Sequence, residues 1–371
     1  MTTLFEESRV KSLLLPNRFF RSATWMALAA DDGSATEQLR DVWFRLAESE
    51  IGLIIAGFSF ISPDGKGPPG MAGMHTDAVA ESFRPVVEGV HARGGRIAAQ
   101  IAHCGVKSRP LPGMGDVAGP SEVIRKDGLL EARALEKEEI ARIVADFAAA
   151  AARARAVGFD AVQLHCAHGY LASQFLSPHY NRRTDEYGGS PQNRLRFLEE
   201  MCRGARAAVG ADYPLMAKLN GEDFLEGGLT LAEGISAAAS LESFGLDLIE
   251  VSGGTGDSGR LGPARAVTSS DDEAYFFRQA LAIRKAVKIP VAVVGGIRRF
   301  EDAERLVDGE GLDYVSLSRP FICEPHLVRR WARGVRMPAH CISCSRCFRT
   351  HLRGHGIYCG WREESRKKKK S

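Results

Sequence analysis

The chain has 371 residues, of which 44% are hydrophobic and 26% charged, as is typical of a folded protein with a sizeable core. Its net charge of +3 is too small to indicate nucleic acid as the main partner. No apolar run reaches the roughly 18 residues of a membrane span, and residues 1–9 lack the pattern of a signal peptide, so we expect a cytoplasmic protein.

Short apolar runs alternate with segments of helical spacing along the chain. The predicted strands are Arg18–Ala23, Gly52–Ile61, Arg96–His103, Ala161–Ala167, Leu215–Gly221, Leu246–Gly254, Pro290–Ile297 and Tyr314–Phe321. The predicted helices are Thr36–Glu50, Asp77–Arg93, Glu136–Val157, Ser190–Val209, Thr230–Phe244, Asp272–Val287, Phe300–Val307 and Glu324–Arg333. Eight strand–helix units with continuously apolar strands predict an α/β fold of the (β/α)8 TIM-barrel type.

The barrel is expected to span residues 1–335, and residues 336–371 to form a short Cys-rich extension with a basic tail at Lys367–Lys370. The alternative fold is a doubly wound open sheet, which favours a Gly-rich turn after the first strand. The chain has Thr24-Trp25-Met26 at that point, so the barrel is preferred.

Polar and Gly-rich segments follow the last two predicted strands, where a barrel of this kind places its active site. Gly295-Gly296 let backbone N–H groups approach a phosphate, and Ser318-Arg319 add a hydroxyl and a charge-assisted hydrogen bond. We therefore expect a phosphorylated ligand at this position.

The fourth predicted strand ends in the segment that carries the candidate catalytic residues His165, His168 and Tyr170. Two imidazoles at a strand end could donate hydrogen bonds to one carbonyl oxygen that becomes negative during reaction. The phenol of Tyr170 could supply a proton as a general acid. A zinc site is the alternative interpretation, with His103 as the only obvious third ligand.

A resemblance to a known family covers essentially the whole barrel. The segment from His165 to Pro178, continued by Asn181–Ser190 and Asn193–Phe197, resembles the signature of the Old Yellow Enzyme family of flavin-dependent ene-reductases. Pro16–Arg18, Gln100–His103, Val251–Gly254 and Ser318–Phe321 follow in the family's order.

The resemblance implies FMN as cofactor and NADH or NADPH as electron donor. The residues that it assigns to FMN are Ser22, Ala23, Thr24, Gln100, Lys218, Ser252, Gly253, Gly295, Gly296, Ser318 and Arg319. It implies that His165 and His168 hold the oxygen of an α,β-unsaturated carbonyl substrate while a hydride reaches its β-carbon, with Tyr170 as candidate proton donor. Three residues depart from the family pattern: Ala23 replaces a frequent Pro, Trp25 a smaller residue, and Lys218 a frequent Arg.

The extension contains Cys341-x2-Cys344-x2-Cys347-x11-Cys359, a spacing that suits a 4Fe–4S cluster or a zinc ion, with free thiols as the remaining alternative. The spacing resembles the cluster segment of dienoyl-CoA reductases and trimethylamine dehydrogenase-like enzymes, which pass single electrons to FMN. Cys104, Cys166, Cys202 and Cys323 are expected to be packing residues.

Two functions therefore remain open from the sequence. The first is an NAD(P)H-dependent ene-reductase acting on a small-molecule alkene. The second is a dienoyl-CoA reductase-like or amine dehydrogenase-like enzyme that receives electrons from a separate protein through the cluster. A non-enzymatic FMN-binding subunit is a more distant hypothesis. We expect a homo-oligomer with neither nucleic acid nor membrane as a partner.

Overall fold

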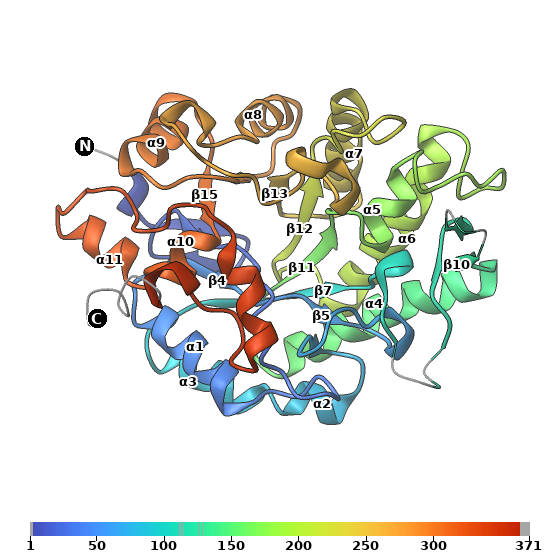
Figure 1. The fold of residues 1–371 in the computed structure, drawn as a ribbon, viewed down its shortest axis with the longest axis horizontal. Coiled ribbons are helices and arrows are strands. Elements are labelled where there is room, and N and C mark those ends of the chain that lie inside the picture. Colours follow the sequence, from blue (N-terminus) through green and yellow to red (C-terminus); the bar gives the residue numbers. More distant parts are fainter. Residues whose placement is uncertain (1–2, 111–112, 114, 126, 128, 364–371) are drawn as a thin grey trace.

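Eight parallel strands close into a barrel at the centre of the molecule (Figure 1). The computed structural model describes residues 3–110, 113, 115–125, 127 and 129–363. The barrel strands are β3 (Phe19–Arg21), β4 (Leu53–Ile55), β7 (Ile97–Ala102), β11 (Ala161–Cys166), β12 (Leu215–Asn220), β13 (Leu248–Ser252), β14 (Val291–Val294) and β15 (Tyr314–Leu317). They pair in chain order and β15 pairs with β3, which confirms the predicted TIM barrel.

The barrel interior is apolar at the N-terminal end of the strands. Phe20 and Met216 belong to an inner cluster that also contains Val10 of β1 (Ser8–Val10) and Leu13 and Leu15 of β2 (Leu13–Leu15). The β1–β2 hairpin therefore closes this end of the barrel, and the polar residues of the interior lie toward the other end.

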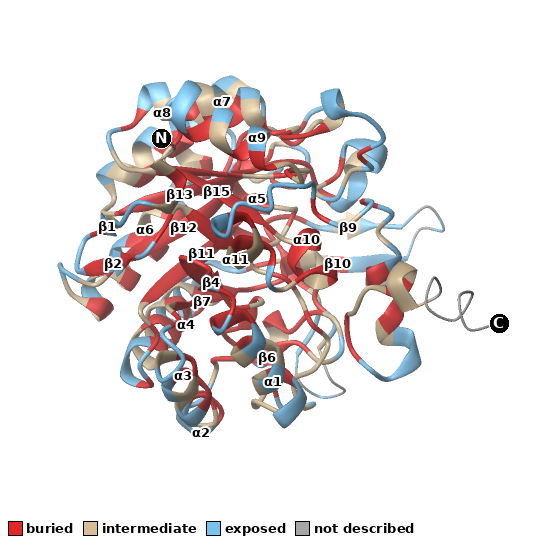
Figure 2. Ribbon diagram, turned by 90° about the vertical axis from the view of Figure 1, so that its left-hand side faces the viewer, coloured by how far each residue is buried: buried red, intermediate tan, exposed pale blue. Residues whose placement is uncertain are grey.

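Helices surround the barrel and bury the faces that they turn toward it, while their outer faces are exposed (Figure 2). They are α1 (Glu37–Ala47), α2 (Asp77–Glu81), α3 (Arg84–His91), α4 (Lys137–Ala156), α6 (Pro191–Val209), α7 (Leu231–Ser243), α8 (Phe277–Ala286), α9 (Phe300–Glu304) and α11 (Leu327–Ala332). The single helix predicted over residues 77–93 is wrong in one respect: it is divided before Arg84, because Pro85 favours the first turn of a new helix.

Some predicted boundaries also differ. The strand predicted over 52–61 is interrupted and resumes as β5 (Ser59–Phe60), which pairs with β6 (Ala72–Gly73) and β7. The strand predicted over 314–321 ends at Leu317. Residues 319–321 of that prediction belong instead to α10 (Arg319–Cys323). The short helix α5 (Leu171–Leu176) was not predicted, nor was the small sheet of β8 (Ala118–Gly119), β9 (Val123–Ile124) and β10 (Leu130–Ala134).

The C-terminal extension packs against the segment that follows β3. The Ile357 N–H group donates to the Met26 carbonyl oxygen at 2.9 Å, and the His351 ring lies 4.7 Å from the Trp25 ring. The extension therefore lies at the C-terminal end of the barrel, where the candidate site is. The predicted basic tail, Lys367–Lys370, lies outside the described residues. Within the described chain, no helix combines the length and the apolar character needed to cross a membrane.

Candidate active site

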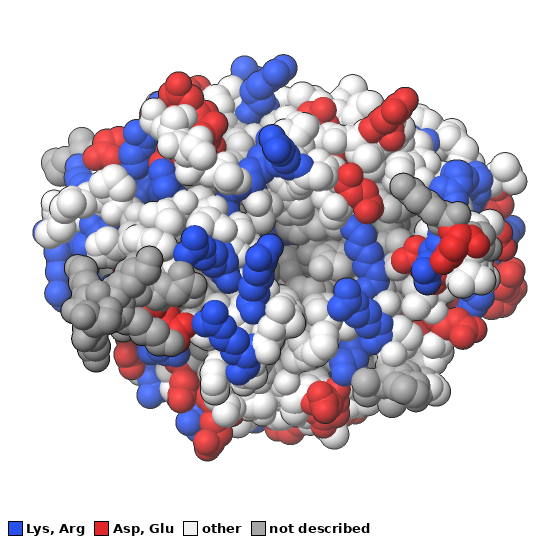
Figure 3. Space-filling model, in the orientation of Figure 1, with Lys and Arg blue, Asp and Glu red and all other residues white. Residues whose placement is uncertain are grey.

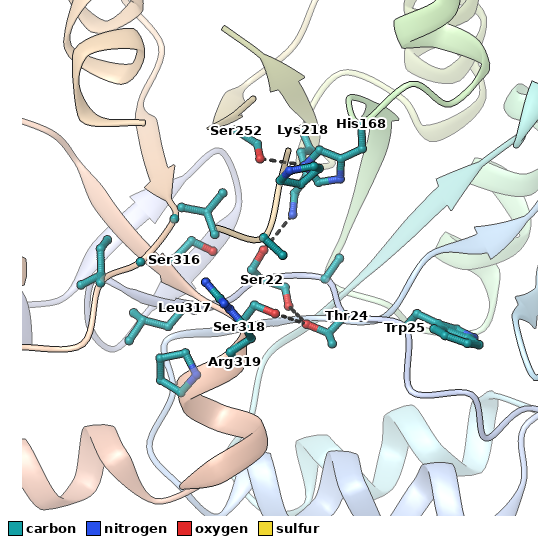
Figure 4. Close-up of a pocket in the computed structure, with 18 of the residues that line it drawn as sticks. Ser22, Thr24, Trp25, His168, Lys218, Ser252, Ser316, Leu317, Ser318 and Arg319 are labelled. Atoms are coloured by element: carbon teal, nitrogen blue, oxygen red, sulfur yellow. Dashed lines mark hydrogen bonds between the residues drawn. The ribbon is translucent and has the colours of Figure 1, made fainter. Parts of the chain in front are cut away.

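A pocket of about 920 Å³, including its open mouth, lies at the C-terminal ends of the barrel strands (Figure 4). Its walls include every residue predicted for the catalytic and cofactor sites except Gly253, namely Ser22, Ala23, Thr24, Gln100, His165, His168, Tyr170, Lys218, Ser252, Gly295, Gly296, Ser318 and Arg319.

The two predicted histidines lie together, with ring centroids 5.2 Å apart. His165 is the fifth residue of β11, and its Nδ1 atom accepts the Ala167 N–H group at 3.3 Å, so its proton is on Nε2. The His168 Nε2 atom is 2.8 Å from the Ser252 hydroxyl (Figure 4). Within the described part of the chain, His165 Nε2 and His168 Nδ1 have no protein partner, so both atoms are available to a ligand.

Both imidazoles are neutral at pH 7. Burial, followed by the nearby Lys218 ammonium group, holds the pKa of His165 well below its usual range. Burial, followed by His165 and Lys218, does the same to the pKa of His168. Neutral imidazoles donate hydrogen bonds without a full positive charge, so the pair suits an oxygen that gains negative charge during a reaction.

His168 depends on the backbone after β11 for its position. Its φ angle is +64°, in the left-handed region, and its N–H group donates to Asn220 Oδ1 at 3.2 Å. Its carbonyl oxygen accepts from Lys107 Nζ at 3.3 Å. A left-handed histidine is held here by contacts from the end of β12 and from Lys107, and such backbone conformations concentrate at functional sites.

Tyr170 completes the aromatic wall of the pocket. Its ring lies 4.9 Å from His165 and 5.1 Å from Phe58, measured between centroids. Burial raises the pKa of the Tyr170 phenol above its usual value, so the phenol carries its proton at neutral pH. Geometry and protonation are therefore both compatible with a proton donor.

A network of buried polar side chains forms the floor of the pocket. Lys218 Nζ donates to Ser22 Oγ at 2.7 Å and lies 3.3 Å from Glu250 Oε2. Glu250 also accepts from Gln163 Nε2 at 2.9 Å and from Ser316 Oγ at 2.7 Å. Gln163 in turn accepts from the predicted flavin residue Gln100 at 2.6 Å.

Lys218 and Glu250 each oppose the effect of burial on the pKa of the other. Burial lowers the pKa of Lys218, and Glu250 opposes that shift. Burial alone would raise the pKa of Glu250, but Lys218 and the hydrogen bonds from Ser316, Ser22 and Gln163 outweigh it and lower the pKa. Lys218 is therefore one half of a buried ion pair. Glu250 is not among the residues predicted from the sequence, although an acidic residue inside an apolar strand is a signal for it.

The predicted phosphate side of the pocket combines glycines with hydroxyls. Gly295 and Gly296 have φ angles of 125° and 77°, and a Cβ on either would meet the Tyr275 ring within 2.8 Å. Thr24 Oγ1 lies 2.8 Å from Ser318 Oγ (Figure 4). This side therefore presents backbone and hydroxyl groups to the pocket, and the Tyr275 ring packs directly against the two glycines.

Arg319 joins the phosphate side to the extension. Its Nη1 atom donates to the Ser343 carbonyl oxygen and to Ser345 Oγ, each at 3.0 Å, and its Nη2 atom donates to the Arg265 carbonyl oxygen at 2.7 Å. Ser343 and Phe348 themselves line the pocket. The extension was predicted as a separate unit, so the contacts of Ser343 and Phe348 with the pocket were not predicted.

Gly253 is the one predicted cofactor residue that does not line the pocket. It is buried, and a Cβ there would lie 2.8 Å from the Phe276 ring and 2.9 Å from the Phe224 ring. Close packing of these rings, rather than a ligand, explains the glycine. Trp25, which departs from the family pattern, does line the pocket, and its indole donates to the Pro69 carbonyl oxygen at 3.1 Å.

Basic side chains flank the mouth of the pocket, where Figure 3 shows Lys and Arg on both sides of a central hollow. Lys107 reaches the His168 carbonyl oxygen, and the exposed Arg109 is close enough to Tyr170 to act on its pKa. An anionic part of a cofactor or substrate would meet a favourable potential here.

The four cysteines of the extension line a second, smaller cavity of about 310 Å³, together with Cys323 and Arg319. Burial, then Cys341 and Cys344, raise the pKa of the Cys347 thiol to about 11, which shows that these sulfurs are near one another. In residues 3–363, apart from the gaps given above, no group of three or more His, Cys, Asp or Glu is arranged around a single metal ion.

The histidine zinc site that was the alternative interpretation is therefore not formed. His103 does not line the pocket; its Nδ1 atom accepts the Gly105 N–H group at 3.1 Å, and its Nε2 atom is 3.7 Å from Asp64 Oδ1. The third ligand that His165 and His168 would need is directed elsewhere.

Comparison with known proteins agrees with this geometry. The sequence matches the NADH:flavin oxidoreductase / NADH oxidase family over residues 3–337. An NADH oxidase from Thermoanaerobacter brockii is 36% identical over 346 residues, which are 92% of this chain and 52% of that protein. This chain thus spans about half the length of that relative.

Two solved structures are also similar. A 2-naphthoyl-CoA reductase in complex with 2-naphthoyl-CoA has a TM-score of 0.82 at 26% identity, covering 90% of this chain and 52% of that one. Morphinone reductase has a TM-score of 0.75 at 31% identity, covering 91% of both chains. The resemblance to the Old Yellow Enzymes is thereby confirmed, and the chain belongs to the NADH:flavin oxidoreductase / NADH oxidase family.

Proposed function

We propose that this chain is an FMN-dependent enzyme that uses NADH or NADPH to reduce the C=C bond of an α,β-unsaturated carbonyl compound. The observation that carries the proposal is the neutral pair His165 and His168, each with one ring nitrogen free for a ligand in the pocket at the C-terminal ends of the barrel strands. Family membership supports the flavin chemistry, and morphinone reductase shows a similar fold over nearly its full length.

The residues of the pocket fit FMN. Gln100, Lys218 and Ser22 would hold the isoalloxazine ring, and Gly296, Ser318 and Arg319, which also line the pocket, would hold the phosphate. FMN, when bound, would supply the chemistry of accepting a hydride from the nicotinamide and donating it to the alkene.

The chain's own residues then have distinct tasks. His165 and His168 donate two hydrogen bonds to the substrate carbonyl oxygen and stabilise its growing negative charge. Tyr170 holds a proton at its hydroxyl, within reach of a substrate on the aromatic wall. Lys218 places a cation at the floor, and Glu250 keeps that cation charged.

We propose further that Cys341, Cys344, Cys347 and Cys359 hold a 4Fe–4S cluster. All four line one cavity, as a cluster requires, but they do not converge on a point, as a tetrahedral zinc with Zn–S bonds of about 2.3 Å would require. The cluster would carry single electrons between FMN and a donor.

A cluster would also be compatible with the second function, which is reduction of an enoyl thioester with electrons from a separate protein. The basic mouth of the pocket suits the phosphates of such a substrate, and the 2-naphthoyl-CoA reductase is a structural relative. The histidine pair serves a ketone and a thioester alike, so only an assay separates the two substrates.

The test is to purify the protein without oxygen, record its visible spectrum, and follow NADH and NADPH oxidation with cyclohexenone, a cinnamate-type acid and a dienoyl-CoA. We expect bound flavin and faster oxidation when the preferred alkene is present. Colourless protein that does not take up added FMN would contradict the proposal. Flavin that is reduced by dithionite and reoxidised by a dienoyl-CoA, but is not reduced by either nicotinamide, would favour the second function.

A further inference from the structure

The second cavity holds one cysteine more than a cluster needs. Besides the four cysteines of the extension, the Cys323 side chain lines its wall. A 4Fe–4S cluster takes four thiolates, one on each iron. Cys323 comes from α10 of the barrel, outside the spaced motif, so no sequence pattern assigns it a role in the cavity.

Helix α10 fixes the position of this fifth thiol. Arg319 begins the helix and Cys323 ends it, so the two residues are four positions apart and share one helix face. Arg319 lines both cavities, whereas Cys323 lines only the second. Cys323 is 4% exposed, and its carbonyl oxygen accepts from Arg362 Nη1 at 2.7 Å, which fixes the end of the helix against the extension.

The nearest sulfur to Cys323 is that of Cys359, and while both residues are thiols the Cys359 Sγ atom donates to the Cys323 Sγ atom at 3.5 Å. A cysteine that binds iron is a thiolate and can only accept a hydrogen bond. If Cys359 is the ligand, Cys323 must be the donor of this contact. Cys359 is the better placed to bind, because it belongs to the spaced motif of the extension and is only partly buried, while Cys323 is buried at the end of α10.

We propose that Cys323 is a fifth, non-ligating thiol of the cluster site, which donates an S–H···S hydrogen bond to the iron-bound sulfur of Cys359. This inference rests on the cluster proposed above. Hydrogen bonds to the sulfurs stabilise the more negative, reduced state and raise the reduction potential of a cluster. The Ser343 N–H group, 3.4 Å from Cys341 Sγ, makes a similar bond on another sulfur.

The experiment compares four variants of the full-length protein: Cys323→Ala, Cys323→Ser, Cys359→Ala and, as a matched control, Cys202→Ala. Cys202 is also a fully buried cysteine, but it lies in α6 and does not line the cavity. Each protein is purified without oxygen and reconstituted with ferrous iron and sulfide. Iron and sulfide per chain, the EPR spectrum of the reduced protein, its midpoint potential and its FMN content are then measured.

We expect the Cys323→Ala variant to keep about four iron atoms per chain and a reduced-cluster EPR signal, but with a midpoint potential more negative than that of the wild type. The Cys323→Ser variant retains a donor, so its potential returns toward the wild-type value. The Cys359→Ala variant loses iron, and the Cys202→Ala variant changes neither quantity. FMN content near the wild-type value shows that each variant is folded.

Three results would overturn the proposal. Loss of iron from Cys323→Ala, with FMN retained, would make Cys323 a ligand. An unchanged potential in Cys323→Ala would show that no hydrogen bond reaches the cluster. A wild-type protein that takes up no iron would contradict both the proposed cluster and this proposal. The ene-reductase function is tested separately, by the flavin colour and by alkene reduction.

Discussion

Replacing Glu250 by Gln removes one charge from the buried ion pair at the floor of the pocket while keeping the shape of the side chain. At the observed 3.3 Å between Lys218 Nζ and Glu250 Oε2, the lost attraction is about 5 kcal/mol at an effective dielectric constant of about 20. Removing one partner of a buried pair costs about 3–5 kcal/mol in proteins, because the other charge stays behind unbalanced. We therefore expect the free energy of unfolding to fall by about 3 kcal/mol or more near pH 6, measured by urea denaturation.

The pH dependence of this loss has a definite sign. Burial already lowers the pKa of Lys218 in the folded state, and Glu250 is the group that opposes the shift, so its loss lowers that pKa further. The unfolded chain then binds more protons than the folded chain at neutral pH, and stability rises with pH. The free energy of unfolding of the Glu250→Gln variant should therefore approach that of the wild type as the pH rises from about 6 to about 9.

Two controls make the interpretation specific. Adding Lys218→Met removes the unbalanced cation, so the double variant should be more stable than Glu250→Gln alone. Glu131→Gln changes an exposed glutamate and should leave the stability nearly unchanged. A Glu250→Gln protein as stable as wild type at pH 6, or a double variant that simply adds the two losses, would refute the electrostatic reasoning.

Three further predictions concern the pocket. The double variant His165→Ala, His168→Ala should slow alkene reduction by about 100-fold or more but affect flavin reduction by NAD(P)H much less. The two half-reactions are measured by rapid mixing, and equal losses in both would contradict the assigned role. Tyr170→Phe should lower the rate of alkene reduction by about 10²-fold without changing flavin binding, and an unchanged rate would exclude the phenol as the proton donor. Gly296→Ala should weaken FMN binding, measured by fluorescence titration, because the new Cβ would lie 2.8 Å from the Tyr275 ring at a φ of 77°; an unchanged dissociation constant would show that the backbone can adjust.

The sequence predicts the barrel well because its strands are buried on both faces and therefore read as uninterrupted apolar runs. It also predicts most of the pocket, since the carboxyl ends of parallel strands meet at one end of a barrel and the polar residues there must converge. The same reasoning misplaces Gly253, because a glycine that makes room for Phe224 and Phe276 has the same pattern as one that makes room for a ligand.

The floor network is harder to predict for a physical reason. Lys218 and Glu250 are direct neighbours across β12 and β13, but their pairing depends on the register between two strands that are about 30 residues apart in the chain. A single polar residue in an apolar strand does not show which face it occupies or which partner it meets. The contacts of Ser343 and Phe348 with the pocket are equally long-range, and no local pattern indicates them.

The bonds from Arg319 to Ser343 and Ser345 have a consequence for how this protein can be altered. A residue of the proposed phosphate site is held by the same peptide that carries the cysteines, so trimming the chain near residue 336 would remove part of the pocket wall as well as the proposed cluster. A variant without the proposed cluster should therefore be made by replacing the cysteines and keeping the peptide.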